Sequence, residues 1–428
     1  MSKNIIVIEP QLHLYKELKK VAIEENDNMY FISNKMDISS KYEDVLFLDL
    51  FNDYDNSLEE IKKLINTEKF YIVTANESYL LTTQKLKKDL NINKFEIDEY
   101  IAFRDKGIMK KLFKENEVNT AESYFYKTIK ELSTEKENIK YPVIIKPTGG
   151  FASCGVKKIN TAEELVRHLN KIAVLNKTVL SKTNNNNSGF LIEQFIEGNE
   201  YAIDTIWFDG KPIIDGIFSK GNDKGPYFPD RVYCIDPELS ESIKSSLLNE
   251  SYKAVRALGA RSGATHTEIR IMGGVPYVIE TAIRPGAGGY FYKILSKAYN
   301  VDFFKIYYYS ISCDSYEEFN DKCSEFDLNP CNIESYLWYN MTLQGSGVIK
   351  NIHNIDKIVD REEVVSYELF QFPGDRVYPK DLNTSYFCWI FSKIFGENPL
   401  EKSNELAEIY DSIISIEYEE KEKGDIND

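Results

Sequence analysis

The chain has 428 residues, of which 43% are hydrophobic and 28% are charged, an ordinary balance for a globular protein of two or three domains. Its formal net charge of −16 argues against nucleic acid or an anionic membrane as a partner, because both repel an acidic surface. Six cysteines form no Cys-x-x-Cys pair and the four histidines are scattered. We therefore expect reduced thiols and a cytoplasmic protein, without a signal peptide, a spanning helix or a histidine-rich metal site.

The first 95 residues alternate short apolar runs with amphipathic helical patterns. Strands are predicted at 5–8, 30–32, 45–48 and 71–74, and helices at 12–23, 58–65 and 80–90. This alternation predicts an open parallel α/β domain. Glu9 and Pro10, not a glycine, follow the first strand, so the fingerprint of a dinucleotide-binding domain is absent.

The pattern changes after residue 95 and predicts a second domain over 96–330 and a third over 331–428. Helices are predicted at 104–115 and 242–258, a capping box at 161–164, strands at 142–146, 191–195 and 201–207, and a last helix near 404–414. The asparagine run at 184–187 indicates a surface loop, and the charged residues from 417 onward indicate a disordered tail. The expected fold class is α/β, with α+β character in the later parts.

A lysine ends the buried strand at 142–146, and a glycine-rich loop follows it. The loop includes Gly149, Gly150, Ser153 and Gly155. Small residues let backbone N–H groups converge on an anion, and Lys146 adds a point charge. The spacing is not that of a P-loop, and a plain turn is the alternative.

Two glutamates occupy a predicted hairpin at 266–284, where apolar and polar residues alternate on both sides of a Gly-Gly turn. If Gly273, Gly274 and Val275 form a three-residue loop, Glu268 and Glu280 face each other directly. Like charges there repel by about 3 kcal/mol at an effective dielectric of ~20. A magnesium ion between them would remove that cost, whereas a solvated edge with two unrelated acids is the alternative.

Other candidates come from three short segments. Residues 193–200, which include Glu193 and Glu200, end a strand; they could meet an adenine edge and a ribose, or form only an acidic surface turn. Residues 285–289 form a glycine-rich turn before a helix, so Gly288 and Gly289 are expected to bind a substrate carboxylate beside Arg284, unless the turn is purely structural. Lys220 is a weaker candidate for the γ-phosphate. His266 either contacts substrate or phosphate or is a structural histidine.

Taken in order, these motifs resemble the ATP-grasp carboxylate–amine ligases, and most closely the L-amino acid ligases among them. The matching segments are 104–106, 142–146 with its loop, 193–200 and 268–289, and segments 345–349 and 372–377 resemble the C-terminal domain of these ligases. The spacings also match: Glu193 and Glu200 are seven residues apart, Glu268 and Glu280 twelve, and Arg284 follows Glu280 by four.

The resemblance implies an ATP-grasp fold and a role for each motif. Lys106 and Lys146 would hold the phosphates of ATP under a flexible lid at about 118–198, with the glycine loop closing over them. The adenine would be lined by Glu193, Gln194, Phe195 and Ile196, and Glu200 would hold the ribose. Glu268 and Glu280 would carry Mg²⁺, with Mn²⁺ as an alternative. Arg284 would stabilise the transferred phosphoryl group and the acyl phosphate.

One position departs from the family pattern. Ala282 stands where many members have an asparagine that serves as a further metal ligand, so the number of metal ions stays open. The leading hypothesis is an ADP-forming ligase that joins a carboxylate, expected to be an amino acid, to an amine or to an acceptor on a carrier protein. A small-molecule kinase and a nucleotide-binding regulator without turnover are the alternatives, and a homodimer stays open.

Overall fold

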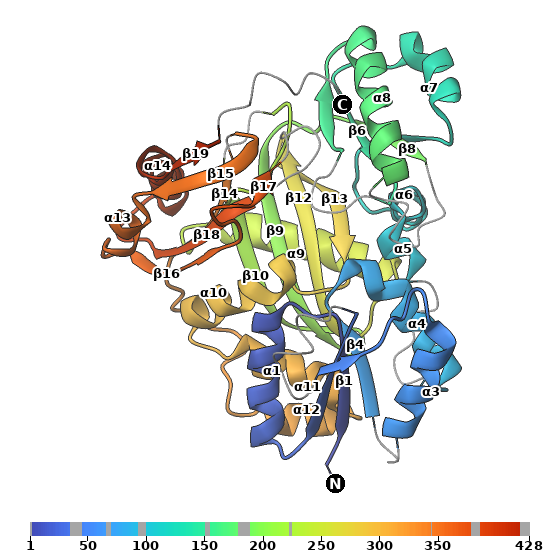
Figure 1. Cartoon of the computed structure of the whole chain (residues 1–428), viewed down its shortest axis with the longest axis vertical. Helices are drawn as coiled ribbons and strands as arrows, with labels where there is room; N and C mark the ends of the chain where they lie inside the picture. Colours follow the sequence, from blue (N-terminus) through green and yellow to red (C-terminus); the bar gives the residue numbers. More distant parts are fainter. Residues whose placement is uncertain are drawn as a thin grey trace.

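The computed structural model describes residues 2–34, 45–65, 70–92, 100–149, 155–178, 189–221, 225–343, 345–377 and 386–419. The chain arranges a small N-terminal unit, a lid and a C-terminal region around a central sheet (Figure 1). None of the helices found in these residues has the length and apolar character needed to cross a bilayer.

The N-terminal unit is the predicted open parallel sheet. Its strands are β1 (Asn4–Ile8), β2 (Asn28–Ser33), β3 (Val45–Phe47) and β4 (Phe70–Thr74), in the order β3-β2-β1-β4. Helices α3 (Tyr54–Leu64) and α4 (Leu80–Asp89) cover one face, and α1 (Leu12–Glu24) covers the other. The short helix η1 (Glu77–Tyr79) directly follows β4, which brings Glu77 to the carboxyl edge of the sheet.

The lid is a four-stranded antiparallel sheet with its helices on one face. Its strands are β5 (Ser123–Tyr126), β8 (Phe190–Gln194), β6 (Val143–Pro147) and β7 (Lys157–Ile159), in that order. Helices α7 (Ile129–Glu135) and α8 (Ala162–Thr178) pack on Val143 and Ile145 of β6. Because side chains alternate along a strand, Ile144 and Lys146 face the other way, into the hollow.

The central sheet runs through the middle of the molecule. Its strands are β13 (Val275–Ala282), β12 (Gly263–Met272), β9 (Asn199–Phe208), β10 (Lys211–Lys220), β11 (Val232–Ile235), β14 (Tyr336–Thr342), β18 (Tyr386–Lys393) and β16 (Val364–Leu369), in that order. Helix α9 (Glu241–Ala257) packs on one face, and α10 (Tyr290–Tyr299) and α11 (Phe303–Ser312) pack on the other. Helix α12 (Tyr316–Cys323) extends this second layer.

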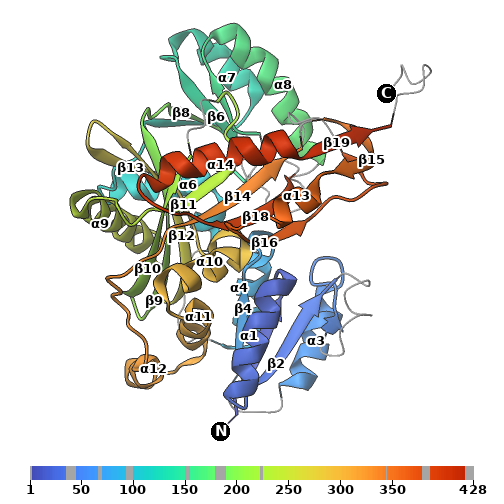
Figure 2. The ribbon, with the colours of Figure 1, turned by 90° about the vertical axis from the view of Figure 1, so that its left-hand side faces the viewer.

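The C-terminal region adds strands to the central sheet and a small sheet of its own. Strands β14, β18 and β16 continue the central sheet beyond β11. The small sheet has the order β17 (Arg376–Val377), β15 (Gly347–His353) and β19 (Ser415–Tyr418). Helices α13 (Ile355–Val359) and α14 (Pro399–Ile413) complete the region, and α14 lies across β11 and β14 (Figure 2). The domain boundaries near residues 95 and 330 remain predictions.

The predicted helix at 104–115 is two helices. Helix α5 (Ile101–Arg104) ends at Asp105, and α6 (Lys106–Glu115) begins after it. The Asp105 side chain accepts hydrogen bonds from the backbone N–H groups of Gly107 and Ile108, at 2.8 and 3.0 Å, and so caps α6. This break points Lys106 toward the hollow instead of toward solvent.

Candidate active site

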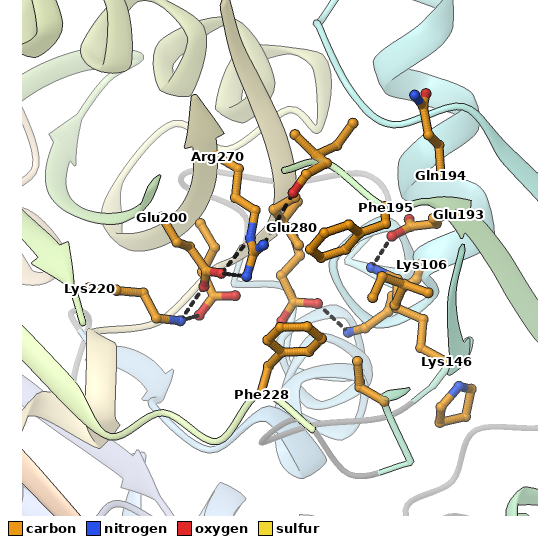
Figure 3. A pocket seen from close by; sticks show the side chains of 16 residues that line it. Lys106, Lys146, Glu193, Gln194, Phe195, Glu200, Lys220, Phe228, Arg270 and Glu280 are labelled. Atoms are coloured by element: carbon orange, nitrogen blue, oxygen red, sulfur yellow. Dashed lines mark hydrogen bonds and ion pairs between the residues drawn. The ribbon is translucent and has the colours of Figure 1, made fainter. Parts of the chain in front are cut away.

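A hollow of about 740 Å³, part of it open to solvent, lies between the lid sheet and the central sheet (Figure 3). Its wall includes predicted site residues from both parts: Lys106, Lys146, Glu193, Gln194, Phe195, Ile196, Glu200, Lys220, Glu268 and Glu280. Residues that the sequence analysis did not assign to this site also line it: Ile144, Pro147, Val156, Phe228, Arg270 and Ile279. The motifs lie far apart in the chain, and the fold brings them to one place.

The lid side of the hollow carries a buried ion cluster. Lys146 on β6 lies 2.7 Å from Glu193 Oε2 on β8, and Lys110 on α6 lies 3.2 Å from Glu193 Oε1. All three side chains are buried. Burial would raise the pKa of Glu193, but Lys110 and Lys146 outweigh burial and lower it. The Glu193 side chain is therefore ionised and directed at lysines.

The hairpin of β12 and β13 pairs Glu268 with Glu280, as predicted, but not for the predicted reason. The loop has two residues, Gly273 and Gly274, both with positive φ, and Met272 pairs with Val275. A two-residue loop alone would put Glu268 opposite residue 279. Ile279 instead forms a β-bulge, which adds one residue to β13 and brings Glu280 opposite Glu268.

The bulge is held from outside the hairpin. The backbone N–H of Val278 donates to the carbonyl of Asn119 at 2.8 Å, and the Val278 carbonyl accepts from Thr120 Oγ1 at 2.7 Å and from Lys110 Nζ at 3.1 Å. The segment that leads from α6 into the lid therefore fixes the strand immediately before Ile279 and Glu280.

Both hairpin carboxylates are ionised and each contacts a lysine. Lys106 Nζ lies 2.9 Å from Glu280 Oε2, and Lys220 Nζ lies 3.1 Å from Glu268 Oε1. Burial opposes ionisation, but the lysines lower the pKa of both glutamates below the ordinary value. Two opposed carboxylates that are already deprotonated fit a hard divalent cation.

The described residues hold no group of three or more His, Cys, Asp or Glu side chains suited to a metal ion. A cation at Glu268 and Glu280 would therefore depend on water and ligand oxygens for the rest of its coordination, which is usual for Mg²⁺. Ala282 is paired with His266 in the ladder and offers no ligand atom.

A second ion cluster surrounds Glu200. Arg270 lies 2.7 Å from Glu200 Oε2, Lys220 Nζ contacts Glu200 Oε1 at 2.5 Å, and Asp230 lies 2.9 Å from Lys220 Nζ. The Arg270 guanidinium also lies about 5 Å from the rings of Phe195 and Phe228. These contacts place Glu200 at the end of the hollow away from Lys106 (Figure 3).

His266 is held by an aspartate on the neighbouring strand. Its Nδ1 lies 2.6 Å from Asp204 Oδ1, and its Nε2 lies 3.7 Å from Glu268 Oε1. Burial would lower the pKa of His266, but Asp204 outweighs burial and raises it to about 9, so the ring is protonated at neutral pH. The other oxygen of Asp204 accepts from the backbone N–H of Gly286 at 2.7 Å. Asp204 thus connects the hairpin to the glycine-rich turn.

Arg284 lies outside the lining of the hollow and contacts the N-terminal unit. Its Nη2 lies 3.3 Å from Glu77 Oε2, and Arg104 Nη1 lies 3.4 Å from Glu77 Oε1. Burial acts against the charge of Arg284, but Glu77 and Asp204 raise its pKa. The Glu77 carboxylate between two guanidinium groups marks this junction as a further charged centre.

The predicted anion turn is the helix η4 (Gly286–Gly289), which leads into α10. Gly288 and Gly289 have positive φ, and a Cβ on them would lie 2.7 Å from Gln11 and 2.9 Å from Leu14 of α1. Close packing on α1 therefore requires glycine at both positions. Their predicted role in binding a carboxylate remains a prediction.

The glycine loop after β6 is only partly described. Gly149 lies in the turn that follows β6, and Gly155 has a φ of 79°, with its carbonyl oxygen 3.3 Å from His168 Nε2. Gly150 and Ser153 lie outside the described residues, as does the asparagine run at 184–187. Their predicted roles stay predictions.

Several charged residues of the site escaped the sequence analysis, namely Glu77, Lys110, Asp204, Asp230 and Arg270. Two of them had a usable signal. Glu77 follows a parallel strand, where ligand-contacting residues often lie, and Arg270 stands two residues from Glu268 on the same face of a strand. Lys110 looks like any solvated lysine of an amphipathic helix, and only the fold shows that it is buried.

Comparison with known proteins agrees with this architecture. An ATP-grasp domain model matches residues 139–291. Alanine–anticapsin ligase of Bacillus subtilis (strain 168) is 26% identical over 246 residues, which cover 53% of this chain and 51% of that protein. L-arginine-specific L-amino acid ligase of Bacillus subtilis is 25% identical over 338 residues, which cover 74% and 75%. The chain spans about half the length of the alanine–anticapsin ligases that it matches.

The likeness to a solved structure covers nearly the whole chain. The crystal structure of L-amino acid ligase from Bacillus licheniformis superposes with a TM-score of 0.82 at 25% identity, over 98% of this chain and 99% of that one. The order of the lid, the central sheet and the N-terminal parallel sheet is therefore a known arrangement. The chain contains an ATP-grasp domain and has the ATP-grasp fold, and it resembles L-amino acid ligases in sequence and in structure.

Proposed function

We propose that this protein is an ATP-dependent ligase that activates the carboxylate of an amino acid as an acyl phosphate and couples it to an amine, releasing ADP and phosphate. The observation that carries the proposal is the pairing of Glu268 with Glu280, within reach of Lys106 and Lys220, in a hollow between the lid and the central sheet. The likeness to amino acid ligases supports the choice of substrate class.

Different residues of the hollow would hold different parts of a nucleotide. Lys106 and Lys146 would face the phosphates, Phe195 and Ile196 would line the base, and Glu200 would accept from the ribose hydroxyls. Bound Mg²⁺, held by Glu268 and Glu280, would neutralise phosphate oxygens. Lys106 contacts Glu280, so a bound nucleotide would take Lys106 as its partner and the metal would take the carboxylate.

The chemistry needs two displacements and no protein nucleophile. A carboxylate oxygen of the amino acid attacks the γ-phosphorus, and the bond from that phosphorus to the bridging oxygen breaks to leave ADP. The amine nitrogen then attacks the acyl carbon, the bond from carbon to the phosphate oxygen breaks, and the amine loses a proton. Arg284 would stabilise the transferred group, because positioning and charge neutralisation dominate such reactions.

The neighbours of Arg284 support an amino acid as the activated substrate. Glu77 lies beside Arg284 at 3.3 Å, so a cation and an anion stand next to each other. An amino acid carries the same two charges on adjacent groups. Arg284 would meet the carboxylate and Glu77 the ammonium. The acceptor class remains wide and includes a second amino acid, a polyamine, an amino sugar or an amine on a carrier protein.

The test is the product balance with ATP, Mg²⁺ and a panel of amino acids, first with hydroxylamine and then with pairs of amino acids. We expect ADP and free phosphate in equal amounts, a hydroxamate with hydroxylamine and an amide with the natural amine. AMP instead of ADP would overturn the acyl-phosphate route. Phosphate retained on the product would show a kinase, and nucleotide binding without turnover on any mixture would show a regulator.

A further inference from the structure

Three parts of the site meet at the ammonium group of Lys110. Its Nζ lies 2.6 Å from Thr120 Oγ1, 3.1 Å from the Val278 carbonyl oxygen and 3.2 Å from Glu193 Oε1. These acceptors belong to the segment that enters the lid, to the bulged strand β13 and to the lid strand β8. Lys110 is only 3% exposed, and it does not line the hollow.

Glu193 is the shared counterion of two buried lysines. Its two oxygens contact Lys110 and Lys146, and each of the three side chains is at most 3% exposed. An ionised carboxylate at such depth is costly to leave without a partner. If Lys146 were its only partner, moving Lys146 to a phosphate would strand the carboxylate.

We propose that Lys110 is a positioning residue that keeps Glu193 neutralised while Lys146 exchanges Glu193 for a nucleotide phosphate. This inference rests on the proposed nucleotide site. The cluster of Lys110, Glu193 and Lys146 has two positive charges and one negative charge. One cation is therefore free to pair with an incoming anion, and Lys110 is the one that stays, because its other two contacts tie it to Thr120 and Val278.

The environment of Lys110 is consistent with this role. Burial lowers the pKa of Lys110 to about 8, against the opposing effect of Glu193, so the ammonium form still predominates at pH 7. A lysine with three fixed contacts has little freedom to move. Within the described residues, the Lys146 ammonium contacts Glu193 and no backbone carbonyl, and both side chains line the hollow.

The same ammonium also supports the metal carboxylates. Lys110 donates to the carbonyl of Val278, the last regularly paired residue before the bulge at Ile279. That bulge sets Glu280 opposite Glu268. Lys110 therefore connects Lys146, through Glu193, to the hairpin. Its loss should weaken nucleotide binding even though Lys110 does not line the hollow.

The test compares Lys110→Met with Lys111→Met. Lys111 is the next residue of α6, and its side chain is 73% exposed and 3.8 Å from Glu115, so it controls for loss of one charge on the same helix. Mg·ADP binding is measured by titration calorimetry, and folding by urea unfolding. We expect Lys110→Met to weaken Mg·ADP binding about tenfold or more, because Lys146 becomes the sole partner of Glu193. Lys111→Met should stay within about twofold of wild type.

Two further variants separate charge from structure. Lys110→Gln keeps a donor for the Val278 carbonyl and lacks the charge, so it should bind Mg·ADP as weakly as Lys110→Met. It also carries the test if the methionine variant does not fold. Adding Glu193→Gln to Lys110→Met removes the carboxylate that retains Lys146 and should recover part of the lost affinity.

A purely structural Lys110 gives a different result. Lys110→Met would then lower the urea midpoint and leave the affinity of the folded protein for Mg·ADP unchanged, which overturns the inference. Mg·ADP binding is measured without amino acid or amine. A wild-type chain that binds Mg·ADP but forms no amide therefore overturns only the proposed ligase function. A wild-type chain that does not bind Mg·ADP overturns both.

Discussion

At the scale of single residues, the site works through carboxylates that already have lysine partners. Glu280 is ionised because Lys106 and Lys146 outweigh its burial and lower its pKa. In Glu280→Gln a neutral amide replaces the carboxylate that we propose as a metal ligand. The substitution also removes the ion pair with Lys106. We expect Glu280→Gln to raise the Mg²⁺ concentration needed for half-maximal turnover by at least about tenfold. Turnover measured against Mg²⁺ checks this, with the exposed Glu241→Gln as control. An unchanged Mg²⁺ requirement would contradict the metal assignment.

The sequence predicted the residues that line the hollow better than the residues that hold them in place. Glu268 and Glu280 are recognisable because two opposed acids on a hairpin repel each other unless a cation lies between them. Glu77 and Lys110 each act through partners more than 150 residues away, Arg284 and Val278, and no local pattern announces such a contact. Asp105 and Lys106 are both buried, although charged residues early in a helix are usually solvated.

At the scale of elements, the hairpin shows how a correct pairing followed from an incorrect loop. The predicted three-residue loop was wrong, because Gly273 and Gly274 form a two-residue turn. The bulge at Ile279 supplies the missing residue. Alternation along β13 predicts which side chains share a face only up to that bulge. The hydrogen bonds that hold Val278 beside the bulge come from Asn119, Thr120 and Lys110, which lie outside the hairpin.

The glycine-rich turn before α10 allows a prediction that separates packing from backbone strain. Gly274 and Gly289 both have positive φ, so alanine at either position costs about 1 kcal/mol of strain. A Cβ at Gly274 meets nothing within 4 Å, whereas one at Gly289 would lie 2.9 Å from Leu14 Cδ1. We expect Gly289→Ala to lower the free energy of unfolding in urea by more than Gly274→Ala. Equal losses would show that α1 does not pack on the turn as described.

At the scale of the whole molecule, strands cross the boundaries that the sequence predicts. The sheet that begins with β13, in the hairpin of Glu268 and Glu280, ends in the C-terminal region with β18 and β16. In the N-terminal unit, Glu77 forms an ion pair with Arg284, and α1 packs against the glycine-rich turn. The fold class could be predicted because each part has its own strand and helix periodicity. The contacts between these parts could not be predicted, because they depend on single side chains such as His13.

His13 on α1 makes the contact between α1 and α10 sensitive to acid. Its ring lies against the ring of Tyr290 on α10, and it hydrogen-bonds to the backbone of Gly288. Burial, together with Lys293, lowers the pKa of His13 to about 3 from 6.5. Between these two values the unfolded chain binds a proton at this site and the folded chain does not. His13 therefore makes the free energy of unfolding fall as the pH decreases from 6.5 toward 3.

Replacing the titrating ring should remove that part of the pH dependence. We expect His13→Leu to lose less stability than wild type between pH 7 and pH 4.5, whatever its stability at pH 7. Urea midpoints at pH 7, 5.5 and 4.5 measure the difference. His353→Leu is the matched control, because His353 lies on β15 and its side chain is 52% exposed. If His13→Leu and wild type lose stability in parallel, while His353→Leu also follows wild type, protonation of His13 does not oppose the packing of α1 on α10. The acid sensitivity would then have to arise elsewhere, as in the partly buried carboxylates around Lys106 and Lys220.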